Sequence, residues 1–437
     1  MRYVIIGNGG AGVRAAQTIR AWDAEGEITI VDREAHPCYY RMRLPDYISG
    51  WRKRESVFFV PESFYADNRV EFLRGETVTA VDAANRLVRL EKNGDLPYDR
   101  LLVAAGARPR ELACPGGDLD GVVYLRTLDQ ADDIIRRAGE AKAAVALGGG
   151  LLGVEMARAF NELGLATSYL IREDRFWPQM LDAAGSSLVE RVLAEKGIEL
   201  RKGEGIEEIH GEGGRVTGVR TTAGTEHQAD MVGVAIGVVS NLEFLEGSGL
   251  ETDRGVLVDE GLRASLPDVF AAGDIAQALD VGSGEHRLVT SWLNTQRQGE
   301  TAGINMSGGE TYLEAVIPYN IIVIYGLPVA CIGLDLPPED AGYETLTGDY
   351  PRDGKYRKLV LRDGFLVGAT FIGEVREAQA AEALIKGKTD ISAWRDRLFE
   401  PGFDLRSRLE EARSLPPNHA LWAAAPRPLC ARRFPIA

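Results

Sequence analysis

One pattern of strand, glycine turn and helix occurs twice along this chain. The two segments are RYVIIGNGGAG at residues 2–12 and AVALGGGLLG at residues 144–153. In each, a short apolar run precedes three glycines spaced GxGxxG, and a helical pattern follows, over residues 11–22 and 151–163. The glycines are Gly7, Gly9 and Gly12 in the first copy and Gly148, Gly150 and Gly153 in the second. One GxGxxG is weak evidence, but two complete copies predict two nucleotide-binding βαβ units.

An acidic residue lies at the same distance beyond both glycine turns. Asp32 follows Gly12 by 20 residues, and Glu173 follows Gly153 by 20 residues. In such a unit the first glycine permits a tight turn, the second lets the backbone approach a pyrophosphate, and the third lets helix and strand pack closely. The helix N-terminus then faces the phosphates, and the acid accepts hydrogen bonds from a ribose. The spacing therefore predicts two bound dinucleotides.

Short β-type runs surround these units, and a separate module follows them. The runs occupy residues 70–105 and 206–236, and a buried strand at 269–272 leads to Gly273 and Asp274 before a helical stretch. Beyond residue 318 we expect strands 320–325, 329–334, 358–362 and 365–372 and a helix over 376–386. We expect four parts: a discontinuous first domain (1–113 and 241–318), a second domain (114–240), an α+β domain (319–415) and a tail (416–437).

Charge and composition exclude several classes of function. The chain has 50 basic and 65 acidic residues, a net charge of −15, which disfavours nucleic acid as a partner. No apolar run reaches the roughly 20 residues of a membrane-spanning helix. The widely spaced Cys38, Cys114, Cys331 and Cys430 form no CxxC motif, and the five histidines form no metal-binding pattern, so we predict no metal site. A reducing cytoplasm is the expected location.

Together these segments resemble the pyridine nucleotide–disulfide oxidoreductase superfamily, over roughly residues 1 to 400. The run ITIVDREAHPCYYRMRLPDYISG at residues 28–50 is most similar to the branch without an active-site dithiol. That branch contains rubredoxin and ferredoxin reductases and the N-terminal half of the nitrite reductase large subunit. The resemblance implies an α/β fold with two Rossmann-like domains of the glutathione-reductase type, inserted β-meanders and a C-terminal α+β domain. The first domain would bind FAD and the second NAD(P)H.

The resemblance also implies roles for residues of the FAD domain. Gly7, Gly9 and Gly12 would hold the FAD pyrophosphate, and Asp32 its adenosine ribose. The remaining matches are Val78 at the adenine, Ala105 and Gly106 in the family's ATG segment, Gly273 and Asp274 at the ribityl and phosphate portion, Trp292 near the flavin pyrimidine edge, and Arg41 beside the flavin. Arg41 would be the cation that stabilises the reduced flavin.

The nicotinamide site is implied by the second glycine motif. Gly148, Gly150 and Gly153 match GGGxxGxE, and Glu155 matches the acid that relatives place near the nicotinamide carboxamide and the flavin. Glu173 would repel the 2′-phosphate of NADPH, which favours NADH. Arg172 and Arg175 flank Glu173 and could clamp that phosphate, so NADPH stays open as an alternative.

Two departures from the family separate this chain from its thiol-dependent branches. Met42 stands where those branches carry a redox cysteine, and Cys38 is expected to be a spare buried thiol. Pro45–Asp46 stands where relatives read Ser–Lys, which leaves Arg41 or Arg43 as the cation beside the flavin. Thiol–disulfide chemistry therefore cannot operate at the usual position.

The resemblance implies an FAD-dependent NAD(P)H oxidoreductase that passes hydride to flavin and electrons on to a rubredoxin- or ferredoxin-type carrier protein. One alternative is an NAD(P)H oxidase, quinone reductase or disulfide reductase that acts on a small molecule. Another is a flavin-holding subunit or redox-sensing interaction protein. A homodimer formed through residues 319–415 is a further expectation, and the sequence does not identify the electron acceptor.

Overall fold

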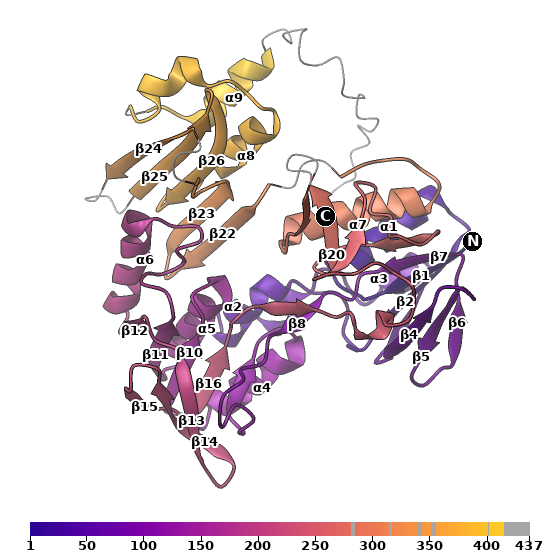
Figure 1. Ribbon diagram of the computed structural model, residues 1–437, viewed down its shortest axis with the longest axis horizontal. Helices are drawn as coiled ribbons and strands as arrows, with labels where there is room; N and C mark the ends of the chain where they lie inside the picture. The colour runs from indigo at the N-terminus through magenta and orange to yellow at the C-terminus, as the bar shows by residue number, and fades with distance from the viewer. Residues whose placement is uncertain (281–284, 314–316, 339–341, 351–354, 401, 415–437) are drawn as a thin grey trace.

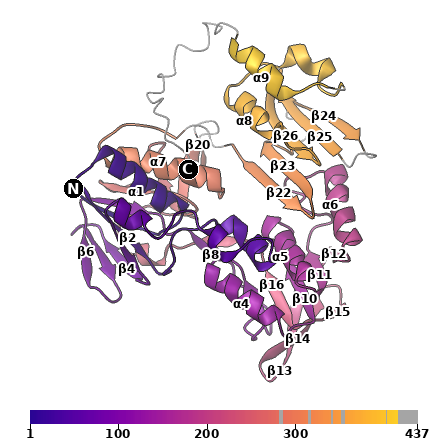
Figure 2. The same cartoon turned by 180° about the vertical axis from the view of Figure 1, so that it is seen from behind.

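The computed structural model describes residues 1–280, 285–313, 317–338, 342–350, 355–400 and 402–414, with the predicted tail at 416–437 outside this range. Two sheet-and-helix units and a third, C-terminal unit are visible in Figure 1 and, from behind, in Figure 2. Among the helices of the described residues, none combines the length and apolarity needed to cross a bilayer. The predicted α/β fold class is confirmed by this architecture.

The first unit is a five-stranded parallel sheet with strand order β19-β7-β1-β2-β3. Its strands are β1 (Arg2–Ile6), β2 (Glu27–Asp32), β3 (Val70–Arg74), β7 (Arg100–Val103) and β19 (Val269–Ala271). The predicted strand at 269–272 therefore belongs to the same sheet as the strands β1 and β2 of the first βαβ unit. The runs at 70–73 and 101–105 belong to it too, which corrects our grouping of them with a meander, because their apolar residues pair with β2 and β1.

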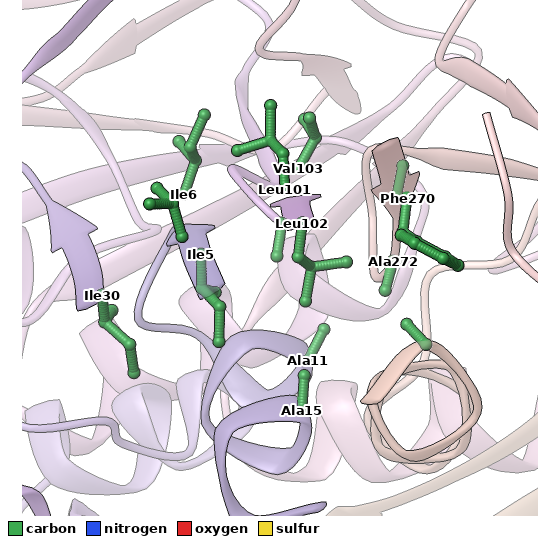
Figure 3. Packing of buried hydrophobic residues seen from close by; sticks show 14 of the residues in the cluster. Ile5, Ile6, Ala11, Ala15, Ile30, Leu101, Leu102, Val103, Phe270 and Ala272 are labelled. Atoms are coloured by element: carbon green, nitrogen blue, oxygen red, sulfur yellow. The ribbon is translucent and has the colours of Figure 1, made fainter. Parts of the chain in front are cut away.

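Two helices cover one face of this sheet. They are α1 (Gly10–Trp22) and α7 (Trp292–Met306). They pack closely because Gly299 and Gly303 of α7 have no side chain: a Cβ on either would clash with the α1 backbone at Ala11 or Ala15. Figure 3 shows Ala11 and Ala15 facing the buried Ile5 and Leu102 of the sheet, in the core that fixes α1 against β1.

The second unit repeats the first with different residues. Its parallel sheet has the order β12-β11-β10-β16-β9. The strands are β9 (Val122–Tyr124), β10 (Ala143–Leu147), β11 (Ala166–Ile171), β12 (Glu199–Lys202) and β16 (Met231–Val234), and the helices are α4 (Leu128–Ala138), α5 (Leu151–Glu162) and α6 (Ala183–Glu195). Helix α5 ends one residue before the predicted end at 163 and lies between the parallel strands β10 and β11, as expected of a βαβ unit.

Small sheets, antiparallel except for one parallel strand pair, are inserted in both units and between them. They comprise β4 (Val78–Asp82), β5 (Leu87–Leu90) and β6 (Asp95–Pro97); β13 (Ile206–Glu212), β14 (Arg215–Thr221) and β15 (Glu226–Gln228); β18 (Val256–Val258), β20 (Ala276–Asp280) and β21 (Glu285–Leu288); and the pair β8 (Ala107–Pro109) with β17 (Val238–Ser240). The β8–β17 pair joins the two segments where the chain leaves and re-enters the first unit. Short helices α2 (Leu44–Ile48) and α3 (Phe64–Asp67) follow β2.

The C-terminal unit is an antiparallel sheet, β22-β23-β26-β25-β24, with two helices. Its elements are β22 (Tyr319–Ile324), β23 (Leu327–Gly333), β24 (Tyr343–Tyr350), β25 (Lys355–Arg362), β26 (Phe365–Ile372), α8 (Ala378–Lys386) and α9 (Leu405–Ser414). The sequence pattern did not predict β24 or α9, and it predicted the start of α8 two residues before the observed one. One face of this sheet packs on the second unit, where Ile372 and Tyr356 share a core with Leu181 and Leu188.

Candidate functional site

The first glycine turn is built by close backbone packing at the carboxyl end of β1. Gly7 has a φ of +111°, and a Cβ there would clash with the Ala104 carbonyl that follows β7. A Cβ on Gly12 would clash with the Gly7 carbonyl oxygen. Both positions therefore need glycine in order to bring α1 down onto the sheet, whether or not a ligand is bound.

Gly9 differs from its neighbours because it faces open space. It is the N-cap residue of α1, with φ −79° and ψ −175°. No side chain caps this end of the helix with a hydrogen bond. A Cβ on Gly9 would meet no atom within 4 Å. The first N–H groups of α1 therefore point toward an unfilled crevice, which is the arrangement that binds a phosphate group.

A cavity runs across the ends of the parallel strands from this crevice. It consists of two adjoining pockets of about 270 and 480 Å³ that share Gly7, Asp32, Arg33, Ala105 and Asn241. Parallel strands bring their carboxyl ends to one edge, so the residues that follow β1, β2, β7 and β19 meet here. The predicted residues that line it are Gly7, Gly9, Asp32, Arg41, Val78, Ala105, Gly106, Gly273, Asp274 and Trp292. Gly12 lies beneath the cavity and serves packing.

Asp32 lies at the middle of the cavity with its carboxylate fixed by the backbone. The Asn8 N–H donates to Oδ2 at 2.5 Å, and the Glu34 N–H donates to Oδ1 at 2.8 Å. Burial, and the neighbouring Glu34, raise the pKa of Asp32, while these two N–H groups oppose the rise. The carboxylate is therefore oriented toward the cavity before any ligand arrives.

Arg41 lines the cavity, but its charge is already compensated. Its guanidinium forms an ion pair with Glu34 at 2.7 Å and donates to the Tyr39 hydroxyl at 2.9 Å. It also donates to the Arg126 carbonyl oxygen at 2.6 Å. Arg43, the other candidate, stacks on Tyr40 with its guanidinium 3.8 Å from the ring centroid. The assignment of Arg41 as the cation at the flavin stays a prediction.

Arg126 is a cavity residue that sequence reasoning missed. It precedes α4, and its guanidinium pairs with Asp274 at 2.6 Å across the cavity. A guanidinium in a cavity that ends at a helix N-terminus suits a phosphate. The local sequence marks only the Thr127–Gln130 capping box of α4, so nothing distinguishes Arg126 until the fold brings it to Asp274.

Aromatic residues close the other end of the cavity. Trp292 lies 4.8 Å from Tyr40 and 5.1 Å from Phe59, measured between ring centroids. Its six-membered ring also lies over Gly10, at the start of α1, so it reaches the glycine crevice. Its predicted place at the pyrimidine edge of the flavin stays a prediction.

Met42 and Cys38 occupy contrasting environments near this end. Met42 is 49% exposed and lines the cavity, at the position where thiol-dependent relatives carry their redox cysteine. Cys38 is 2% exposed, and burial raises the pKa of its thiol. A buried, protonated thiol is a poor nucleophile, so Cys38 has the character of a packing residue.

The second glycine turn repeats the first one feature by feature. Gly148 has a φ of +133°, and a Cβ there would clash with the Ala235 carbonyl after β16. A Cβ on Gly153 would clash with the Gly148 carbonyl oxygen, whereas a Cβ on Gly150 would meet no atom within 4 Å. The Glu173 carboxylate lies over Gly149. These residues form a second crevice on the other unit and do not line the first cavity.

Glu155 lies on the first turns of α5, half-buried beside this crevice. Burial raises the pKa of Glu155 to about 7; Arg158 acts to lower it and Asp46 to raise it further. Asp46, the residue that replaces the relatives' lysine, forms an ion pair with Arg158 at 2.7 Å. A carboxyl group with this pKa exchanges its proton near neutral pH. Among the described residues, no cluster of His, Cys, Asp or Glu side chains could hold a metal ion.

The fold and the two crevices define a dinucleotide-dependent oxidoreductase, and comparison with known proteins agrees. The pyridine nucleotide-disulphide oxidoreductase family matches residues 1–299, and the rubredoxin NAD+ reductase C-terminal domain matches residues 318–389. The chain belongs to this family. Its predicted branch, its nature as an oxidoreductase and its use of FAD and NADH are confirmed by these matches.

Two relatives and two solved structures illustrate the similarity. The chain is 31% identical over 395 residues to the nitrite reductase [NAD(P)H] of Bacillus subtilis, covering 90% of this chain and 48% of that protein. It therefore spans about half of that relative. It is 31% identical over 406 residues to the ferredoxin–NAD(+) reductase component of the Paraburkholderia xenovorans biphenyl dioxygenase system, covering 93% and 98%.

Among solved structures, the ferredoxin reductase for the CYP199A2 system of Rhodopseudomonas palustris superposes with a TM-score of 0.86 at 26% identity, covering 93% of this chain and 99% of that one. An NAD-dependent persulfide reductase from A. fulgidus superposes with a TM-score of 0.85 at 27% identity, covering 94% and 83%. The two structures carry different named activities on one fold, so the site residues must decide between them.

Proposed function

We propose that this protein is an FAD-dependent NADH oxidoreductase that delivers electrons singly to a small carrier protein of the rubredoxin or ferredoxin type. The observation that carries the proposal is the pair of identically built glycine turns, each with one glycine facing open space at a helix N-terminus. Relatives named rubredoxin-NAD(+) reductase and ferredoxin–NAD(+) reductase support the choice of acceptor.

The residues of the first cavity fit FAD. Gly9 and the start of α1 would hold the pyrophosphate, together with the Arg126 guanidinium, and Asp32 would accept hydrogen bonds from the adenosine ribose. Val78 lies at the opposite end of the cavity from Trp292, where the adenine would bind. When bound, FAD accepts a hydride and releases its two electrons one at a time. The protein's residues supply binding, orientation and charge compensation.

The second crevice would bind the nicotinamide dinucleotide. Gly150 leaves room for the pyrophosphate, and Glu173 would accept hydrogen bonds from the 2′- and 3′-hydroxyls of the adenosine ribose. Arg175 is held by Asp174 at 3.1 Å, which reduces its availability for a 2′-phosphate. These contacts support NADH as the donor and leave NADPH as the weaker alternative.

Replacing Glu173 by glutamine tests the donor preference. We expect kcat/KM for NADH to fall about tenfold, or ~1.4 kcal/mol, because a charged acceptor for the ribose is lost, and kcat/KM for NADPH to rise. The measurement is the steady-state rate with each donor. Glu195→Gln is the matched control, because Glu195 is an exposed acid of the same unit, at the C-terminal end of α6, and should leave the NADH:NADPH ratio unchanged. An unaltered ratio in Glu173→Gln would contradict the assignment.

Direct reduction of a disulfide or persulfide is the main competing activity. Met42 cannot form a mixed disulfide, and Cys38 is buried, so neither residue supplies the thiolate that such chemistry uses. A carrier protein that takes electrons one at a time needs no thiol on the reductase. The absence of an available thiolate therefore favours a carrier protein as the electron acceptor. Two alternatives are distinguished by the anaerobic titration described below. One is the reduction of oxygen or a quinone, and the other is a sensor or scaffold with slow turnover.

Several features of the whole protein belong to the same proposal. We propose domain boundaries at 113/114, 240/241 and 318/319, and the passage of the chain from one sheet to another near these positions supports them. We propose a cytoplasmic protein that does not bind nucleic acid and forms a homodimer through its C-terminal domain. Analytical ultracentrifugation of the full chain and of a chain that ends at residue 318 would test the dimer.

An anaerobic titration tests the function. The purified protein should be yellow, and NADH should bleach the flavin within seconds in a stopped-flow instrument, with NADPH slower. Reoxidation should be slow in air and fast with an oxidised rubredoxin or ferredoxin. Rapid turnover in air would instead identify an oxidase, and slow bleaching a sensor or scaffold.

A further inference from the structure

A loop of the second unit joins the second glycine crevice to the C-terminal unit. It runs from Glu173, whose carboxylate lies over the glycine turn, to Asp182, the N-cap residue of α6. Figures 1 and 2 both show α6 beside the C-terminal sheet. The two are in close contact, because a Cβ on Gly185 in the first turn of α6 would lie 3.3 Å from Cδ1 of Ile372 on β26.

Asp182 is bonded to both units. Its Oδ1 accepts a hydrogen bond from the Gly185 N–H at 2.9 Å, and its Oδ2 accepts one from the Tyr356 hydroxyl of β25 at 2.5 Å. The Lys358 ammonium, two residues along β25 and on the same face, lies 3.5 Å from the same oxygen. The Lys358 side chain is 1% exposed. A buried ammonium is costly without a counter-charge, so Lys358 holds the Asp182 carboxylate in place.

The loop that ends at Asp182 has a strained backbone. Trp177 has a φ of +50°, in the left-handed region that a bulky residue rarely adopts, and its side chain is buried. A strained residue persists only where the surrounding packing holds it. Trp177 and Leu181 share a hydrophobic core with Tyr356 and Ile372 of the C-terminal sheet. That sheet therefore contributes to the conformation of the loop.

Arg175, the residue that could clamp the 2′-phosphate of NADPH, is bonded within this loop. Its Nε donates to the Leu181 carbonyl oxygen at 3.4 Å, and its guanidinium pairs with Asp174 at 3.1 Å. Leu181 is fully buried and directly precedes Asp182. The carbonyl that holds Arg175 is therefore next in the chain to the residue that the C-terminal sheet holds. A guanidinium bonded in this way has fewer donors left for a phosphate.

We propose that Tyr356 and Lys358 are positioning residues that determine donor specificity: by holding Asp182 they keep Arg175 bonded within its loop, which makes the protein select NADH over NADPH. The inference rests on the proposed function, in which the second crevice binds the donor. Tyr356 and Lys358 act through Asp182 and the adjoining Leu181 carbonyl. Release of Asp182 would let the loop relax, and Arg175 would then pair with the 2′-phosphate of NADPH.

The test is a mutant cycle on donor preference in the flavin-loaded protein. Anaerobic stopped-flow reduction gives the Kd of each donor and the limiting rate of flavin reduction separately. Tyr356→Phe removes one hydroxyl group and should lower the Kd for NADPH relative to that for NADH about fivefold, with the limiting rates unchanged. Tyr356→Phe with Lys358→Met should lower it about tenfold. Adding Arg175→Gln to either variant should cancel the gain, because the released loop then carries no guanidinium.

Tyr343→Phe and Lys355→Met are the matched controls, because they make the same chemical changes in the same sheet away from the second unit. Tyr343 accepts a hydrogen bond from Arg362 at 3.3 Å, and Lys355 pairs with Glu374 at 3.0 Å, both within the C-terminal unit. Each control should leave the ratio of the two Kd values unchanged.

The inference is overturned if Tyr356→Phe leaves the ratio unchanged, if it weakens both donors equally, or if the gain persists in the Arg175→Gln background. A purely structural role of Tyr356 predicts the second of these results. Should the variant that also carries Lys358→Met fail to fold, Tyr356→Phe, which adds no atom, decides the question alone. Failure of the proposed function is distinguishable, because it appears in the natural sequence as a protein that binds no flavin or is not bleached by NADH.

Discussion

Replacing Gly9 by valine should give a folded but colourless protein. Gly9 has φ −79° and ψ −175°, which valine also adopts, and a Cβ there would meet no protein atom within 4 Å. The substitution should therefore cost the apoprotein no more than about 1 kcal/mol, the loss expected at an N-cap position. The isopropyl group would occupy the space of the pyrophosphate. We expect the Kd for FAD to rise at least 100-fold, or about 2.7 kcal/mol.

Flavin fluorescence during titration of the apoprotein, together with circular dichroism melting, would measure both effects. Gly12→Val is the contrasting variant, because a side chain there would strike the Gly7 carbonyl oxygen and push α1 off the sheet. It should lose flavin and stability together, by several kcal/mol. If Gly9→Val binds FAD with the affinity of the natural sequence, the pyrophosphate does not lie at this helix end.

The success and the failure of sequence-based prediction at this site have a common physical origin. The glycine turns and their acids act within one βαβ unit, so their spacing along the chain reflects their geometry. The Arg126–Asp274 pair joins residues 148 apart, and α4 brings Arg126 to the cavity only when the two units pack. No local pattern encodes such a contact. Strand β24 was missed for a related reason, since its place is set by pairing with β25.

The cation near the flavin illustrates the same limit. The family resemblance implied that Asp46 stands where relatives carry a lysine and pointed to Arg41 or Arg43 as substitutes. In the folded chain Arg41 is bonded to Glu34, and the guanidinium that meets Asp46 comes from Arg158, 112 residues away. The charge that pairs with Asp46 is therefore supplied from the facing helix α5. A single sequence cannot reveal this exchange, because the two partners lie on different elements.

Gly150→Val should separate the two crevices by leaving the flavin in place while abolishing its reduction. Gly150 has φ −98° and ψ −173° and, like Gly9, faces open space. The same substitution in the second crevice would block the pyrophosphate of NADH, and the FAD cavity would be untouched because Gly150 does not line it. We expect the protein to be yellow and the second-order rate constant for reduction by NADH to fall at least 100-fold, or about 2.7 kcal/mol.

Anaerobic stopped-flow reduction measures this rate constant, and photochemical reduction of the same sample supplies the control, because it requires no nicotinamide. Photoreduced Gly150→Val should still pass electrons to the carrier at the natural rate, since only the entry step is blocked. Gly9→Val and Gly150→Val thus form a matched pair with the same added atoms and different losses. Loss of flavin from Gly150→Val, or unchanged reduction by NADH, would contradict the assignment of one dinucleotide to each glycine turn.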